Sequence, residues 1–321
     1  MNAAVVNIPG QAPRYQSFPD PVPEAGEALV HVRAAGLHPI VRAIASGAHY
    51  SAAGAEQKPS VPGIDGVGVL DDGRRVYFVF VPKPWGTMAE LAAAPRAKCL
   101  PVPDNLDDAT AAAIANPGMS AWVTLHDRAA LAAGETVLIL GATGVAGQLA
   151  IQIARHMGAK RIVAAGRNVE AISEADVDAV IRLTQSEDAI REAFTAEAAA
   201  GIDIVVDYLW GRPTELLLES LAKGFQAKST HRTRHVEVGE SAGKTITLPG
   251  AILRSIDLTL LGSGFGAASL DRIFAAIPEL FSLAAANTLT VGVEPVPLEN
   301  VEEGWSRVEK GRRVVFTVKP S

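Results

Sequence analysis

The chain has 321 residues, a formal net charge of −6 and a hydrophobic share of 48%, which suffices for two domains with cores of their own. Its pI near 5.7 argues against binding to a nucleic-acid backbone, since such proteins usually present a basic face. Cys99 is the sole cysteine, which excludes an intramolecular disulfide and a cysteine-based structural zinc. There is no leader pattern and no apolar run of the roughly 20 residues that a membrane span needs. We therefore expect a soluble, unprocessed, cytoplasmic protein that binds neither nucleic acid nor membrane.

Short β-like runs alternate with Pro and Gly over residues 1–118, which predicts a rolled or barrel-like β domain. The runs are Ala28–Val32, Val67–Leu70, Val76–Val81 and Met88–Leu91. A helix is then expected from Asn105 to Ala115, an interruption at Pro117-Gly118, and a second helix from Met119 to Ala130.

The stretch from Thr136 to Asn168 has the pattern of strand, glycine turn, helix and second strand. An apolar, β-branched run ends at Leu140, and Gly141, Gly144 and Gly147 follow at a spacing of three. Such glycines permit a tight turn, close approach of a pyrophosphate and close packing of the helix that follows. The residues at the helix start, Thr143, Gly144, Val145 and Ala146, would then face the phosphates, where the helix dipole favours an anion.

Besides a dinucleotide-binding turn, this segment has two other interpretations. An ordinary βαβ crossover would use the glycines for packing only. A Walker-type phosphate loop is disfavoured because Gln148, rather than Lys and Ser/Thr, follows Gly147.

Apolar strand-like runs continue to alternate with helical segments after this unit, which predicts an α/β fold with a doubly wound parallel sheet. The expected elements are strands at Val177–Leu183, Ile202–Asp207, Val236–Val238 and Ile256–Leu261, and helices around Ser186–Ala200 and Leu216–Ala222. The basic run Lys228–His235 is interpreted as a solvated loop before a strand. The tail from Asn300 to Val318 is expected to return to the first domain. The resulting division is 1–118 with 267–321 for the β-rich domain and 119–266 for the dinucleotide-binding domain.

The end of the second strand bears on the choice of cofactor. An NAD-binding fold places Asp or Glu there, about 20 residues beyond the last glycine, to bond the ribose 2′-hydroxyl. This chain has Gly166-Arg167-Asn168 instead. Because a carboxylate would repel a 2′-phosphate and Arg167 offers a forked, charge-assisted bond to it, NADP(H) is favoured. The alternative is that Arg167 is a solvated surface side chain.

Six segments in a fixed order resemble the medium-chain dehydrogenase/reductases, and within them the zinc-independent quinone oxidoreductases. Besides the glycine turn they are Ala35–Pro39 (AGLHP), Pro62–Gly68 (PGIDGVG), Asn116–Trp122 (NPGMSAW), Gly262–Gly266 (GSGFG) and Gly311–Val315 (GRRVV). The likeness covers essentially the whole chain. It implies a GroES-like substrate domain, a Rossmann domain, and often a homodimer, for which Ile256–Leu261 is a candidate edge strand.

Zinc-dependent members of that family carry a Cys after the AAG turn and a His-Glu in the PGHE segment. Here His38 and Ile64-Asp65 occupy those places, and Ile64 has no metal-binding atom. The other six histidines are scattered singly, so no ligand set of sensible spacing is present. We therefore expect chemistry without a metal ion.

The resemblance implies hydride delivery from the nicotinamide to a quinone or an α,β-unsaturated carbonyl. His38 and Tyr50 are the candidates to contact the substrate oxygen, because either side chain can donate a hydrogen bond. A structural role is the alternative for both. His38 replaces a cleft Asn of related quinone reductases, and Val41 stands where an acid is common, which puts the substrate in doubt. Trp85 and Phe265 are candidates for an apolar pocket or for the core.

The resemblance also assigns further cofactor contacts. Ser120 matches a hydroxyl near the nicotinamide, and Val238-Gly239 ends a strand at the edge where ligands collect. Ser263, Gly264 and Phe265 are expected beside the nicotinamide. Arg312 or Arg313 would reach the pyrophosphate, with surface solvation as the alternative.

Three competing functions follow from the same residues. A non-catalytic NADPH-binding sensor is suggested by the missing polar residues of the cleft. A zinc alcohol dehydrogenase is the alternative among enzymes. A short-chain dehydrogenase is disfavoured because the glycine turn lies in mid-chain and Arg212, rather than Lys, stands four residues after Tyr208.

Overall fold

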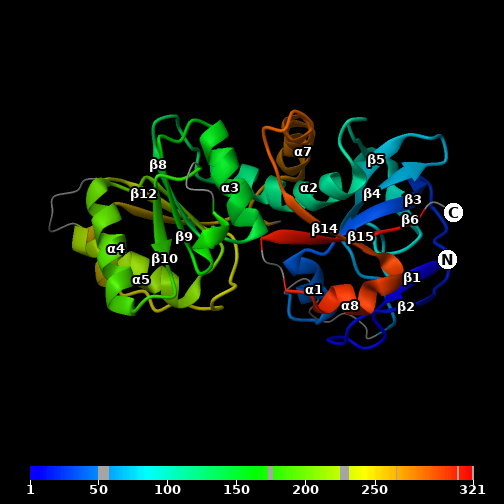
Figure 1. The fold of residues 1–321 in the computed structure, drawn as a ribbon, viewed down its shortest axis with the longest axis horizontal. Coiled ribbons are helices and arrows are strands. Elements are labelled where there is room, and N and C mark those ends of the chain that lie inside the picture. Colours follow the sequence, from blue (N-terminus) through cyan, green and yellow to red (C-terminus); the bar gives the residue numbers. More distant parts are fainter. Residues whose placement is uncertain (50–57, 173–175, 225–230, 265, 309–310, 320–321) are drawn as a thin grey trace. The chain divides into compact units, whose positions relative to one another are not determined.

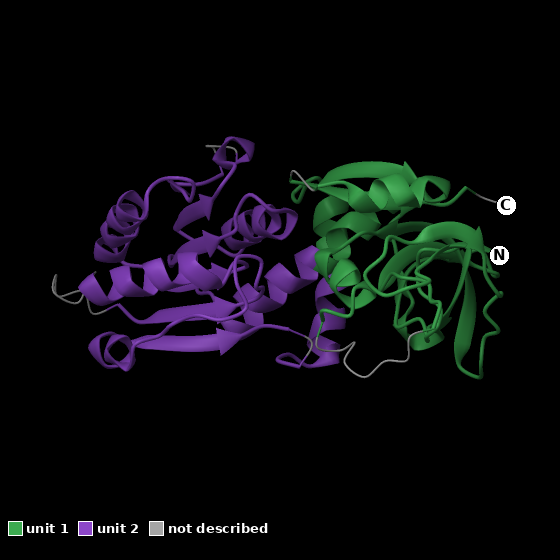
Figure 2. Ribbon diagram, turned by 90° about the horizontal axis from the view of Figure 1, so that it is seen from below, with its two compact units in different colours: residues 1–116, 278–321 green, residues 117–277 purple. Residues whose placement is uncertain are grey.

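The computed structural model describes residues 1–49, 58–172, 176–224, 231–264, 266–308 and 311–319. The chain divides into two compact units (Figure 2). Unit 1 comprises Met1–Asn116 and Pro278–Ser321, and unit 2 comprises Pro117–Ile277. Among the described helices, none combines the length and apolarity of a membrane span.

Unit 1 is built on antiparallel strands. Among its described residues a seven-stranded sheet has the order β14-β15-β3-β4-β5-β7, and β6 also pairs with β3. Only β14 and β15 run parallel to each other in this sheet. The strands are β3 (Glu27–Gly36), β4 (Asp65–Leu70), β5 (Arg75–Val79), β6 (Leu91–Pro95), β7 (Leu100–Pro101), β14 (Gly292–Pro297) and β15 (Arg312–Thr317). A separate pair, β1 (Asn2–Val5) and β2 (Arg14–Ser17), and the helices α1 (Pro39–Ala45) and α8 (Val301–Ser306) complete the unit.

The long strand β3 shows why these residues form a half-covered sheet. Its residues alternate between buried and partly exposed until its last three, which are all buried, because successive side chains point to opposite faces. Val30 and Val32 enter one apolar cluster with Phe78, while Ala35 enters another with Phe316. The tail, which was expected to return to the first domain, contains β15, and β15 pairs with β3 in this sheet.

Unit 2 contains a six-stranded parallel sheet of order β10-β9-β8-β11-β12-β13 in its described part. The strands are β8 (Thr136–Leu140), β9 (Arg161–Gly166), β10 (Ala179–Arg182), β11 (Ile204–Asp207), β12 (Thr233–Glu237) and β13 (Leu258–Gly262), and the helices between them are α3 (Val145–His156), α4 (Glu187–Ala200), α5 (Gly211–Gly224) and α6 (Gly250–Ser255). The order reverses between β8 and β11, as in a doubly wound Rossmann sheet. The predicted α/β fold class is confirmed. β13 lies at one edge of the sheet, and its role in a dimer stays a prediction.

Helices cover both faces of this sheet (Figure 1). Leu138 and Leu140 belong to one apolar cluster with Phe194 of α4 and Leu217 of α5. Alternate residues of β8, such as Ile139, are equally buried and point to the opposite face. The strand is therefore apolar along its whole length, as a doubly covered parallel strand must be.

The predicted interruption of the helix at Pro117-Gly118 is wrong. Helix α2 runs unbroken from Asp108 to Trp122 and passes through Pro117, and a π-helical turn follows from Val123 to Arg128. Proline removes one backbone donor and crowds the preceding turn, which costs about 3 kcal/mol. The helix persists because the turn before the proline, Ala111–Ala115, is fully buried, and such packing supplies most helix stability.

Other predicted elements also differ from the structure. Of the strand expected at Met88–Leu91, only Leu91 belongs to a strand, as the first residue of β6, and Ala89 forms an isolated bridge with Ala3. The Met88 N–H bonds Pro62 O of a loop, so the strand does not extend back to Met88. In the basic run, Thr233 and His235 belong to β12, and His235 is fully buried. Its partner Asp207, described below, explains this burial. Residues 225–230 lie outside the described part of the chain.

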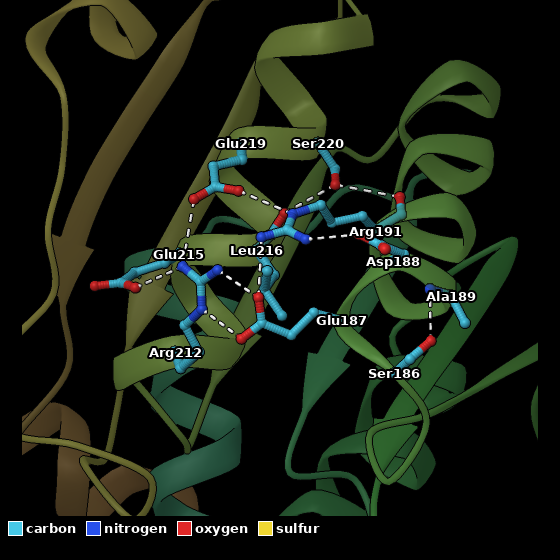
Figure 3. Close-up of polar contacts among 10 residues, drawn as sticks. All are labelled: Ser186, Glu187, Asp188, Ala189, Arg191, Arg212, Glu215, Leu216, Glu219 and Ser220. Carbon is cyan, nitrogen blue, oxygen red and sulfur yellow. Dashed lines mark hydrogen bonds and ion pairs between the residues drawn. The ribbon is translucent and has the colours of Figure 1, made fainter.

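Helices α4 and α5 are joined by a network of charged side chains (Figure 3). Glu187 lies 2.6 Å from Arg212 and 3.0 Å from Arg191. Glu219 lies 3.2 Å from Arg191 and 3.4 Å from Arg212. The hydrogen bond from Arg212, followed by the charges of both arginines, lowers the pKa of Glu187 to about 2. The network is exposed, so its effect is expected to be small and sensitive to salt.

We expect Arg212→Gln to lower the free energy of unfolding most above pH 4.5. Glu187 has a depressed pKa in the folded state, so its contribution is present above the unfolded pKa and is lost as the pH falls from about 4.5 toward about 2. Urea unfolding at pH 7, 4.5 and 3 measures the gap to the unsubstituted protein. Arg254→Gln is the control, since Arg254 is exposed and forms no ion pair with a described residue. A gap that is constant across pH would contradict this account.

Candidate functional site

The turn after β8 is held against the neighbouring strand. Gly141 has φ of +86°, which favours glycine, and the N–H groups of Gly141 and Ala142 both donate to Ala165 O of β9. A Cβ on Gly147 would lie 2.3 Å from Gly141 O and 2.6 Å from Ala142 Cα. The start of α3 therefore touches the turn backbone directly, which only glycine permits.

The first turn of α3 is open to an anion. Gly144 at the N-cap has no side chain to accept the free N–H groups, and the turn contains no acidic residue. Arg155 and His156 lie in the last turn, so charged side chains complement the dipole only at that end. Of the four residues predicted here, Gly144 is exposed, Thr143 and Ala146 are half-buried, and Val145 is buried. A pyrophosphate fits this cradle because backbone N–H groups are its principal donors.

Gly166 ends β9 against Thr143 of the turn. A Cβ on Gly166 would lie 2.5 Å from Thr143 Cγ2, so the glycine is required by contact between the two loops. Arg167 and Asn168 directly follow and are both exposed. Among the described residues Arg167 forms no ion pair, and it is therefore an unengaged cation at the carboxyl edge of the sheet.

Asp207, which the sequence had suggested only as a strand end, organises the next part of this edge. Its Oδ1 accepts the N–H groups of Leu209 and Trp210, both at 2.9 Å. Its Oδ2 lies 2.5 Å from Thr214 Oγ1 and 2.9 Å from His235 Nε2. Burial alone would raise the pKa of Asp207, but the hydrogen bond and charge of His235 and the bond from Thr214 hold it below its ordinary value.

This aspartate also fixes the backbone of the strand ends. Val238 and Gly239 both donate to Asp207 O, at 2.8 and 3.2 Å. Glu237, just before them, is half-buried, and burial together with the Asp207 charge raises its pKa. The predicted pair Val238-Gly239 is thus held at the carboxyl edge beside β11.

Tyr208 lies where the strand order reverses. Its N–H donates to Leu140 O of β8, and its Cβ would be 3.1 Å from a Cβ on Gly141. Its hydroxyl is buried without a hydrogen-bond partner among the described residues, and burial raises its pKa well above the usual range. Tyr208 therefore forms a wall of the dinucleotide turn.

The Gly262–Gly264 loop is tied to the π-helical turn that continues α2. Thr124, fully buried, donates to Ser263 Oγ at 2.8 Å, and Arg128 Nε donates to Gly262 O at 2.8 Å. Ser120 lies in α2, four residues before Thr124 of this turn. The structure thus brings the loop of Ser263 to the helix of Ser120. Phe265 lies outside the described residues. Thr124 was missed because a buried threonine carries no sequence signal.

His38 in unit 1 is buried beside a carboxylate. It precedes α1 at the N-cap, its Nε2 lies 3.1 Å from Asp65 Oδ1, and the two side chains are 1% and 2% exposed. Asp65 Oδ2 accepts the hydroxyl of Tyr77 at 2.9 Å. Tyr50, the other predicted catalytic residue, lies outside the described residues.

The remaining predicted side chains are engaged within unit 1. Trp85 donates to Pro19 O at 3.0 Å, and Arg312, which is exposed, donates to Val293 O at 2.7 Å. Arg313 is buried and donates to Leu37 O at 2.9 Å, so Arg312 is the accessible one of the two. In the part of the chain that the structure describes, no three His, Cys, Asp or Glu residues are grouped as metal ligands.

No family model matches the chain, but curated proteins and solved structures resemble it over nearly its whole length. The probable NADPH-dependent quinone reductase tdiC of Emericella nidulans is 27% identical over 98% of this chain and 99% of its own length. The spectinabilin polyketide synthase system protein NorB of Streptomyces orinoci is 32% identical over 79% of this chain, which spans only 12% of that protein. The quinone oxidoreductase of Thermus thermophilus, also crystallised with NADPH, superposes with a TM-score of 0.75 at 26% identity, covering 99% and 100% of the two chains.

The Rossmann sheet, its glycine turn and the antiparallel unit define a medium-chain dehydrogenase/reductase. Within this family, the near full-length likenesses show that the chain belongs to the quinone oxidoreductase branch. The resemblance predicted from six sequence segments is confirmed.

We expect Gly147→Ala to lower the free energy of unfolding by about 2 kcal/mol, because the new methyl group would overlap backbone atoms of the turn that cannot move aside. The loss should exceed the gain of about 1 kcal/mol that alanine brings to a helix. Gly144→Ala is the matched control, since its Cβ would make an ordinary contact of 3.5 Å. Equal effects in urea unfolding would show that close packing does not govern the turn.

Proposed function

We propose that the protein is an NADPH-dependent, metal-free reductase of quinones or α,β-unsaturated carbonyl compounds. The observation that carries the proposal is the open first turn of α3 together with Arg167, an exposed arginine at the position where an NAD site would present a carboxylate. Membership in the quinone oxidoreductase branch supports the reaction class.

The cofactor's adenosine half is proposed to bind at the carboxyl edge of β8 and β9. The glycine turn and the α3 N-terminus would hold the pyrophosphate, and Arg167 and Asn168 would hold the 2′-phosphate. Arginine suits this role because its planar fork matches phosphate oxygens. Bound NADPH would supply the hydride.

The nicotinamide half is proposed to lie near Ser120, Val238-Gly239 and the Ser263–Gly264 loop. The bond between Thr124 and Ser263 supports this arrangement, since it ties the loop to the helix that carries Ser120. Phe265 and Arg312 remain proposed contacts for the nicotinamide and the pyrophosphate.

His38 is proposed to donate a proton to the substrate oxygen as negative charge develops there. Its Nε2 lies 3.1 Å from a buried carboxylate oxygen of Asp65, and an imidazole N–H is a hydrogen-bond donor, which supports this role. Tyr50 is the second proposed donor. Without a metal ion to polarise a simple carbonyl, a conjugated substrate is the easier hydride acceptor.

A non-catalytic NADPH-binding sensor is the alternative. The buried position of His38, at 1% exposure, favours it, because a buried ring has less access to a substrate. The nucleotide site is equally compatible with both functions.

We expect NADPH oxidation when the protein is mixed with simple quinones or with enones, including α,β-unsaturated thioesters. Absorbance at the reduced-nicotinamide band measures turnover. Tight NADPH binding with no turnover across the panel would favour the sensor. Stoichiometric zinc in the purified protein would favour the alcohol dehydrogenase alternative instead.

We also expect Arg167→Ala to weaken NADPH binding by about 10-fold to 100-fold while NADH binding changes little, because only NADPH carries the 2′-phosphate. Calorimetric titration with both nucleotides measures this difference. Arg155→Ala is the control, since Arg155 lies in the last turn of α3 and pairs with Asp178 at 2.8 Å. Equal losses for NADPH and NADH would contradict the assignment.

A further inference from the structure

A group of buried polar atoms around His38 lacks partners. Neither ring nitrogen of His38 has a hydrogen bond among the described residues, nor does Asp65 Oδ1. The His38 Nε2 to Asp65 Oδ1 distance of 3.1 Å is short enough for a bond, so the ring is misaligned with the carboxylate and not remote from it. An unsatisfied buried polar atom destabilises the fold, and three at one place suggest a function.

Asp65 is held firmly from its own side. Its backbone O accepts the Thr87 hydroxyl at 2.7 Å, and its Oδ2 accepts the Tyr77 hydroxyl at 2.9 Å. Thr87 in turn packs on Gly63, where a Cβ would lie 2.2 Å from Thr87 Oγ1. Thr87 thus fixes the backbone of Asp65, and Tyr77 fixes its carboxylate through Oδ2 and leaves Oδ1 directed to His38.

Tyr77 is suited to act only as a donor to this carboxylate. It is 3% exposed, and burial, followed by the Asp65 charge, raises its pKa well above the usual range. Its ring packs edge-on against Phe281 with centroids 5.7 Å apart. The hydroxyl therefore stays protonated and in place.

The backbone around His38 is also fixed. Leu37 N–H donates to Val314 O, and Leu37 O accepts from Arg313. The imidazole folds back over Gly36, where a Cβ would lie 2.5 Å from Nε2. The ring can rotate toward Asp65 only because position 36 has no side chain.

We infer that Asp65, held by Tyr77, is the positioning residue that directs His38 Nε2–H to itself and presents Nδ1–H to the substrate oxygen. The inference rests on the proposed function for the identity of that oxygen. Catalytic hydrogen bonds are often poorly aligned before substrate binds, which agrees with the misaligned ring.

With an α,β-unsaturated ketone, the β carbon accepts the hydride and its two electrons, the C=C bond electrons move toward oxygen, and an enolate forms. The His38 Nδ1–H bond breaks and an O–H bond forms, so the ring gives up one proton and the product is the neutral enol. Solvent then returns one proton to the ring.

If Asp65 had only a structural role, its substitution would have different effects on the His38 ring and on turnover. If the pair only filled the core, its removal would lower stability and leave the hydrogens on the His38 ring and the turnover of the folded enzyme unchanged. The nitrogen-15 signals of His38 and the split between kcat and KM therefore distinguish the two roles.

The test uses Asp65→Asn and the milder Tyr77→Phe in the full-length protein. Nitrogen-15 spectra of the histidines, with the His38 signals assigned by their loss in His38→Gln, report which ring nitrogens carry hydrogen. We expect hydrogen on both nitrogens of His38 in the unsubstituted protein and on only one of them in Asp65→Asn. We also expect kcat with the best acceptor to fall about 100-fold in Asp65→Asn and about 10-fold in Tyr77→Phe, with KM nearly unchanged.

The matched control is Asp71→Asn, because Asp71 forms a His–Asp pair with His31 in the same unit at the same 3.1 Å but at the surface. It should leave kcat and the His38 signals unchanged. Unchanged His38 nitrogen signals in Asp65→Asn, or in Tyr77→Phe if the first variant does not fold, would overturn the inference. Absence of any turnover by the unsubstituted protein would overturn the proposed function alone, since the spectra still decide the role of Asp65.

Discussion

Contact between backbone and backbone at the glycine turn is the constraint on which the nucleotide unit depends. Gly147 lies so close to Gly141 O and Ala142 that no side chain fits between them. This contact sets where α3 begins, and the same turn is bonded to Ala165 of β9. The helix N-terminus, the end of β9 and Arg167 are therefore placed by one packing contact, and the open anion site follows from it.

Much of this unit could be predicted because its signals are local. The apolar run Thr136–Leu140 is β8 with the same bounds, and the helix begins at Val145 as expected. Glycine spacing and parallel-strand composition depend on neighbours along the chain, so a sequence contains them. The cofactor contacts expected from the same local pattern stay predictions.

What could not be predicted depends on partners distant in sequence. Pro117 interrupts a helix by local rules, yet burial of the preceding turn keeps α2 continuous. Local sequence assigns His235 to a solvated basic run, but in the structure it is buried against Asp207, which lies 28 residues earlier in the chain. His38 and Asp65 stand at two sequence positions where zinc-dependent relatives differ from this chain, and only the fold brings the two side chains within 3.1 Å. In the proposed reaction, this pair supplies a proton at the place where zinc-dependent relatives hold a metal.

Both chain passages between the units occur within helices. The first boundary falls at Pro117 inside α2, and the second at Pro278 inside α7 (Leu270–Ala285). Neither unit is therefore a segment whose ends lie in loops. A gene fragment cut at residues 117 and 277 would begin and end in mid-helix, exposing apolar turns to water, whereas one spanning 108–285 would keep both helices whole. Recombination that exchanged the nucleotide unit between relatives would have to carry these helices with it.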